Sequence, residues 1–198
     1  MPFTEALLMG LSFFWDLLKT WLYTFGVSFA NLSTVWIIVP IWISWFFTEF
    51  FQEKEGTSFG NAISNGVVPL WVGIDWIRHL TDQLIESKIE FSGLVFGKFL
   101  ISAIILVYGF VIIILGIKGR EYIKYLGRIR EITYVLVVFT PFIYGIIEPN
   151  YLYFLSIIIF FPAFYWIIEW IDRMTPEPEV FKKDKEEEAG SVENFEKY

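Results

Sequence analysis

The densest group of residues able to do chemistry is Asp75, Arg78, His79 and Asp82. Their spacing places all four on one face of a helix. A histidine one turn from a carboxylate resembles a general acid–base site, because the carboxylate can fix the tautomer of the imidazole. The same spacing also gives ordinary ion pairs on a solvated helix face. The sequence favours this external, ion-paired face, and an intramembrane enzyme is the less favoured alternative.

Other kinds of catalytic chemistry find little support. The chain has no cysteine and one histidine, which excludes disulfides, thiolate sites and a histidine-based metal cluster within one subunit. It lacks a phosphate-binding loop, a zinc-protease motif and a serine-nucleophile motif. The net charge of −7 argues against nucleic acid as a partner. We therefore predict no catalytic, cofactor-binding or metal-ligating residue and no cofactor.

A second polar group lies in the apolar segment 7–30. A polar stripe at helical spacing consists of Ser12, Asp16, Lys19 and Tyr23. If this segment spans a membrane, Asp16 and Lys19 lie near its middle, where a charge costs at least about 2.5–3.5 kcal/mol and usually serves a function. If it lies flat in the interface, they are an unremarkable ion pair. Glu169, near the end of the last apolar segment, completes a candidate intramembrane polar site.

The elements that position these residues are apolar. The hydrophobic fraction is 56%, aromatic residues make up 21% and the mean hydropathy is +0.55. A soluble domain of this composition would expose large apolar patches to water, whereas a bilayer removes that cost. The chain is therefore predicted to be an integral membrane protein, with the plasma membrane as the expected compartment.

A helix needs about 20 residues to cross a ~30 Å hydrocarbon core. The candidate spans are residues 7–30, 32–51, 95–117, 132–147 and 151–171. The first either spans or lies in the interface, so we predict an all-α polytopic transmembrane bundle of four or five spans over residues 1–172. The charged segment 173–198 is predicted to be a disordered acidic tail.

Small residues recur at intervals of seven along the most apolar span, at Ser102, Gly109 and Gly116. Such a seam lets another helix approach closely. The seam could pack within the chain or against another subunit, and packing within the chain is favoured. Three further candidate spans each carry a proline near the middle, at Pro40, Pro141 and Pro162, where a kink is expected.

The orientation follows from one basic loop, residues 118–131. Its basic residues are Lys118, Arg120, Lys124, Arg128 and Arg130, which we predict to be cytoplasmic and to contact anionic lipid headgroups. Counting back, the connection 52–94 is then external. It contains a re-entrant or surface loop at 61–73 and an amphipathic helix at 70–88 lying on the membrane or across the bundle mouth. Counting forward, the C-terminus is cytoplasmic.

Strong membrane signals without chemistry favour a non-enzymatic subunit, anchor or scaffold of a larger membrane assembly. Its expected partners are the lipid bilayer and other membrane protein subunits or further copies of the chain. The alternative is a small oligomeric transporter or channel for an ion or small solute, using Asp16, Lys19 and Glu169 together with the proline kinks.

Overall fold

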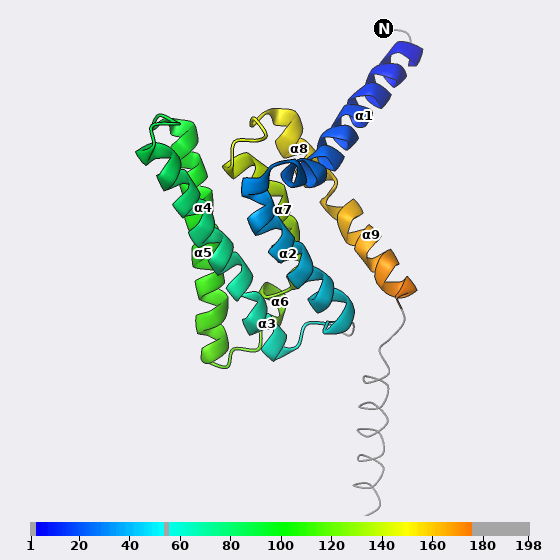
Figure 1. Cartoon of the computed structure of the whole chain (residues 1–198). Coiled ribbons are helices and arrows are strands. Elements are labelled where there is room, and N and C mark those ends of the chain that lie inside the picture. The colour runs from blue at the N-terminus through cyan, green and yellow to red at the C-terminus, as the bar shows by residue number, and fades with distance from the viewer. Residues whose placement is uncertain (1–2, 54–55, 176–198) are drawn as a thin grey trace, which may run out of the picture.

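The computed structural model describes residues 3–53 and 56–175, and this part of the chain is helical, with no strand. The predicted all-α class is confirmed. In chain order the helices are α1 (Phe3–Val27), the 3-10 turn η1 (Ser28–Ala30), α2 (Leu32–Phe51), α3 (Phe59–Asn65), α4 (Val67–Ile85), α5 (Gly93–Ile117), α6 (Ile123–Leu126), α7 (Ile129–Ile143), α8 (Tyr151–Ile159) and α9 (Phe161–Met174) (Figure 1).

Several helix starts are set by short polar side chains that cap them. Asn31 accepts a hydrogen bond from Ser33 N at 3.0 Å, and Asn150 accepts one from Tyr153 N at 2.8 Å. Ser92 caps α5 in the same way. Each side chain satisfies an amide of the first turn that has no partner within the helix. Asn31 therefore explains why α2 begins at the predicted residue.

Two helices in the described part of the chain, α2 and α5, are long and apolar enough to cross a membrane. A third span is counted if α8 and α9, which meet at an angle of 41°, form one broken helix. Pro162 lies in the first turn of α9, directly after this break, so a predicted proline kink is present there. By length and hydropathy the structure thus supports two or three spans, fewer than the four or five predicted.

The small-residue seam of α5 packs within the chain, as favoured from the sequence. A Cβ added at Gly109 would lie 2.5 Å from the backbone nitrogen of Leu70, so the backbones of α4 and α5 are nearly in contact there. A Cβ at Gly73, on α4, would lie 2.7 Å from Leu106. Contacts of Gly116 with Ile63 extend the seam to α3. The order of these contacts makes α3 and α4 antiparallel to α5.

The pair α3–α4 consequently follows α5 along its length (Figure 1). The predicted loop at 61–73 is helical, apart from the junction at Gly66 between α3 and α4. The amphipathic helix predicted at 70–88 begins and ends three residues earlier, as α4, and lies alongside α5 rather than across the end of the bundle. Glycine accounts for this difference, because it lets a helix that is only moderately apolar pack closely against α5.

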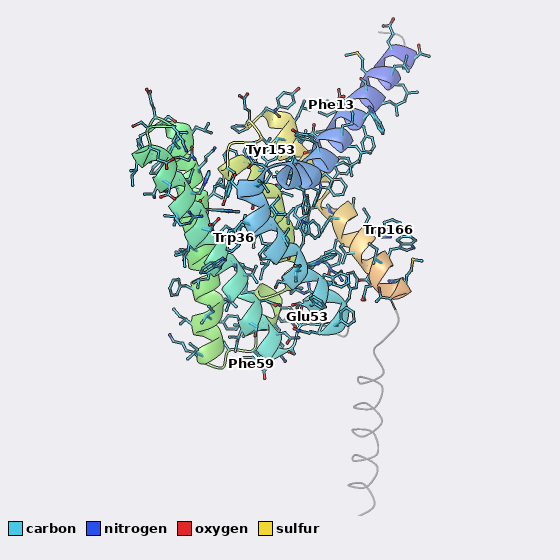
Figure 2. All side chains as sticks on the ribbon, in the orientation of Figure 1. Phe13, Trp36, Glu53, Phe59, Tyr153 and Trp166 are labelled. Carbon is cyan, nitrogen blue, oxygen red and sulfur yellow. The ribbon has the colours of Figure 1, made fainter. Side chains whose placement is uncertain are left out.

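Segments that are far apart in the sequence meet at one end of the molecule, beside α6, which we call the α6 end. Asn65 Nδ2 donates to the carbonyl oxygen of Gly127 at 2.7 Å, and Arg130 pairs with Glu49. Residues 49–53, 56–66 and 118–131 therefore lie at one end, where Figure 2 also shows Glu53 and Phe59. The structure contradicts the prediction that the start of the 52–94 connection lies on the side opposite to the basic loop. We call the other end, where α8 begins, the α8 end.

Helix α1 behaves as two halves. In its second half, Trp21 Nε1 donates to the Tyr134 hydroxyl at 3.1 Å, and Phe25 stacks on Phe164. Its first half projects away from the other helices, and Phe13 lies on the projecting part (Figures 1 and 2). Although α1 has 25 residues, it does not meet the length-and-hydropathy test for a span.

Helix α9 extends to Met174 and so includes the first two residues of the predicted acidic tail. Nearly all of the tail predicted to be disordered, from residue 176 onward, lies outside the described residues.

The close approach of α4 and α5 gives the first testable prediction. Gly109→Ala should destabilise the protein by about 1–3 kcal/mol, because the new methyl group overlaps the backbone of Leu70. The matched control is Gly97→Ala in the same helix, where nothing lies within 4 Å of the added Cβ. Thermal unfolding in mild detergent should show a lower midpoint for Gly109→Ala alone. Equal midpoints for the two variants would contradict the packing described.

Candidate functional site

One largely buried group of charged residues is centred on Arg130, in the first turn of α7. Its Nε donates to Glu49 Oε1 at 2.9 Å, and its Nη2 contacts the same oxygen. Its Nη1 donates to Glu169 Oε2 at 3.2 Å. The guanidinium also lies 4.4 Å from the ring centre of Tyr165. We call these four residues the Arg130 cluster.

The Arg130 cluster joins three helices far apart in the sequence. Glu49 ends α2, Arg130 begins α7, and Glu169 with Tyr165 lies on α9. The exposed fractions of the Arg130 and Glu49 side chains are 12% and 6%. Removing one partner from a buried pair leaves an uncompensated charge, which commonly costs several kcal/mol. The cluster therefore ties the helices together at the α6 end.

Glu53 extends this polar region toward α3. Its two carboxylate oxygens accept from Asn65 Nδ2 at 2.6 Å and Thr57 Oγ1 at 2.9 Å. Burial raises the pKa of Glu53, while these two hydrogen bonds act in the opposite direction. A cavity of about 60 Å³ lies between Glu53 and the Arg130 cluster. It is large enough for water, but too small for an organic substrate.

The second polar group lies at the α8 end and contains the residues predicted as an external cluster. Asp75 is buried: it accepts from the Tyr144 hydroxyl at 2.6 Å and from Arg78 Nη2 at 2.7 Å. Arg78 also pairs with Asp82 at 3.2 Å. The predicted ion pairs are present, but Asp75 does not belong to a solvated face, because α7 covers it.

The His79 ring stacks on the Tyr144 ring, with the ring centres 3.9 Å apart. The half-buried Lys98 donates to the carbonyl oxygen of Ile143 at 3.3 Å, and its ammonium lies 5.2 Å from the ring centre of Phe142. Tyr144 and Asp75 thus join α7 to α4, while Lys98 joins α7 to α5. These contacts hold the helices together. His79, the candidate acid–base residue of the enzyme alternative, packs flat against the Tyr144 ring.

Asp16 and Lys19 form an ion pair at 2.9 Å with both side chains more than half exposed. They line an open cavity of about 670 Å³ together with Glu148 and Asn150, in the turn that follows α7. Glu169 instead pairs with Arg130 at the start of α7. Because the 15 residues of α7, about 22 Å of helix, separate the two places, the structure does not bring Asp16 and Lys19 together with Glu169.

The five basic residues of the 118–131 loop divide into two groups. Arg130 faces Glu49 and Glu169 inside the protein. Lys118, Arg120, Lys124 and Arg128 are exposed, with Arg128 in contact with Glu131 at 3.4 Å. Lipid headgroups remain the expected contacts of the exposed four. In the sequence Arg130 looks like the other four. The one available signal is that Glu49 and Glu169, at the ends of two predicted spans, have no basic residue in the four positions before them.

Within residues 3–53 and 56–175, no three histidine, aspartate or glutamate side chains are grouped so as to hold a metal ion. No protein-family description, curated protein or solved structure matches the chain. The structure itself is therefore the guide to function.

The Arg130 cluster predicts an asymmetry between two arginines. Arg130→Gln should lower the free energy of unfolding by about 3–5 kcal/mol, because Glu49 would be left buried without a counter-charge. Arg173→Gln, which removes an exposed partner of Glu169, should change it by less than about 1 kcal/mol. Thermal unfolding of both variants in the same detergent measures the difference.

A double variant tests the cause. Combining Glu49→Gln with Arg130→Gln should recover part of the stability lost in Arg130→Gln alone, because no isolated charge then remains buried. Strictly additive losses would show that the pair itself contributes nothing.

Proposed function

We propose that the protein is a non-enzymatic, multi-pass membrane component that acts as a subunit, anchor or scaffold of a larger membrane assembly. The observation that carries this proposal is the projecting first half of α1. Large apolar side chains are exposed around most of the helix there: Leu7, Leu8, Met9, Leu11, Phe13 and Trp15. Glu5, Ser12 and Asp16 form one narrow polar strip, and a helix that is apolar around most of its circumference is normally buried.

Lipid alone does not account for this half-helix. Residues 3–15 would extend about 20 Å, too short to cross a ~30 Å core. An interfacial helix buries one apolar face and turns a polar face to water. Between Phe3 and Asp16, only Thr4, Glu5, Ser12 and Asp16 are polar, so the polar face is narrow. Another protein packed on α1 would cover the faces that the interface leaves exposed.

The proposal includes five membrane crossings: α2, α3–α4, α5, α7 together with residues 144–147, and α8–α9. If α5 crosses the bilayer, the α3–α4 pair that follows it along the seam lies at the same depth. The polar residues of α4 then lie at the α8 end, beside Tyr144 and Lys98. Helix α1 lies in the interface at the α8 end, with Asp16 and Lys19 beside the turn that contains Glu148.

The charged residues support a structural role. Arg130 with two glutamates and Asp75 with Arg78 and Tyr144 are engaged between helices. A transporter built on Asp16, Lys19 and Glu169 would need these residues near one another, and they lie at different ends of α7. A transporter or channel is therefore the alternative function, to be tested if the assembly proposal fails.

The test is purification of the tagged chain from native membranes in mild detergent, followed by the mass of the intact complex. The proposal predicts another protein in a fixed ratio to the chain. Truncating Leu8, Leu11 and Trp15 together to Ala should reduce the retained partner about tenfold, the size expected for anchor residues at an interface.

The matched control truncates three exposed apolar residues of α5, Leu100, Val107 and Phe110, to Ala and should leave the partner bound. A chain that purifies alone, or only with copies of itself, would contradict the proposal. Ion and solute flux into proteoliposomes would then test the transporter alternative.

A further inference from the structure

Two apolar grooves run along α7, one on either side. The groove toward α8 has a volume of about 390 Å³ and is walled by Val138, Phe154 and Ile157, among others. The groove toward α4 and α5 has a volume of about 250 Å³ and is walled by Ile105 and Leu136, among others. Val135 and Glu131 line both grooves, so a single ridge of α7 separates them.

The shape of these grooves suits hydrocarbon chains. The first groove runs from Glu131 to Phe139, about 12 Å along the helix. Apart from Glu131 and the tyrosine hydroxyls, its lining and that of the second groove are apolar, so ordered water would find few partners. Both grooves begin at Glu131 and flank the same stretch of α7, which matches a lipid that has two chains.

The charge at one end of the grooves suits an anionic headgroup. Arg128 precedes α7 and its side chain is 45% exposed, with an ion pair to Glu131 at 3.4 Å. That distance leaves the guanidinium, which has five donors, able to bind a phosphate as well. Lys124 lies in the same loop. Arg130 differs, since two glutamates already hold it inside the protein.

Glu131 supplies a second polar feature at this place. Its Oε1 accepts from Arg128, whereas its Oε2 is buried and has no hydrogen-bond partner among the described residues. A buried acceptor without a donor is costly, which favours a ligand that brings a donor. A hydroxyl group on a lipid headgroup is such a donor.

We propose that the two grooves bind one anionic phospholipid that has a hydroxyl-bearing headgroup, such as phosphatidylglycerol. Its two chains occupy the grooves on either side of Val135. Its phosphate contacts Arg128, and a headgroup hydroxyl donates to Glu131 Oε2. This site goes beyond the proposed membrane assembly and does not depend on it, because lipid binding is read on the purified chain without a protein partner.

The experiment adds defined lipids to the full chain after delipidation in detergent and counts bound lipids per chain by native mass spectrometry. Phosphatidylglycerol should bind at one per chain and more tightly than phosphatidylcholine. Arg128→Gln should weaken phosphatidylglycerol about fivefold and leave phosphatidylcholine unchanged. Val135→Trp should reduce both lipids, because the indole ring fills both grooves.

Two matched controls identify the site. Val68→Trp fills a groove of about 210 Å³ between α2 and α4 that has no charged lining residue, and it should leave phosphatidylglycerol bound. Lys124→Gln removes a charge on α6 from a residue that lacks the contact of Arg128 with Glu131, and it should have a smaller effect than Arg128→Gln.

Several outcomes would overturn the proposal. Equal binding of the two lipids by the unaltered chain would remove the headgroup site. An effect of Val68→Trp equal to that of Val135→Trp would show general lipid adhesion. Displacement of phosphatidylglycerol by millimolar inorganic phosphate would show a site for the free anion, without a role for the chains. If Val135→Trp failed to fold, Arg128→Gln, at an exposed position, would still decide the result.

Discussion

The near contact of the α4 and α5 backbones at Gly109 is the constraint on which the rest of the arrangement depends. Side chains larger than hydrogen would hold these helices apart, and a helix as polar as α4 would then have little reason to follow α5. With glycine at the contact, van der Waals packing extends from Gly116 through Gly109 to Leu106, which lies against Gly73. The hairpin fixes which end of α5 lies beside α3, and the remaining helices are placed around it.

Two polar groups complete this placement, one at each end of α7. The Arg130 cluster joins α7 to α2 and α9, and the hydrogen bond between Tyr144 and Asp75 joins α7 to α4. Apolar surfaces slide past one another with little penalty, whereas a buried charge is satisfied in few arrangements. In this structure the polar groups set the register of the helices, while apolar packing supplies most of the contact surface.

Local features of the sequence predicted part of this structure well. Helix α2 has the predicted bounds, because an uninterrupted apolar run follows a capping asparagine. The seam on α5 and the break near Pro162 were visible from residue spacing and from the chemistry of proline. The segment 52–94 was predicted to lie on the side opposite to the basic loop, and this prediction was wrong for the start of the segment. The reason is that each apolar run was treated as an independent span. Helix α4 has too many ionisable residues to be recognised as a partner of α5 by hydropathy.

The pairing of polar residues that are distant in the sequence could not be predicted either. Arg130 and Glu49 are 81 residues apart, and Tyr144 and Asp75 are 69 apart. Before the fold is known, Arg130 looks like any other basic residue of its loop, and Asp75 looks like one member of an exposed helix face. Only the packing of α7 against α2 and α4 distinguishes these residues from their neighbours.

The most direct test of the account is the side of the membrane on which each end lies. The chain has no cysteine, so single cysteines can be introduced at Gly60, Lys88 and Lys124 without altering any native thiol. In sealed vesicles, a membrane-impermeant maleimide should label Gly60→Cys and Lys124→Cys from the same side and Lys88→Cys from the other. Labelling of Gly60→Cys and Lys88→Cys from one side, with Lys124→Cys labelled from the opposite side, would contradict the account.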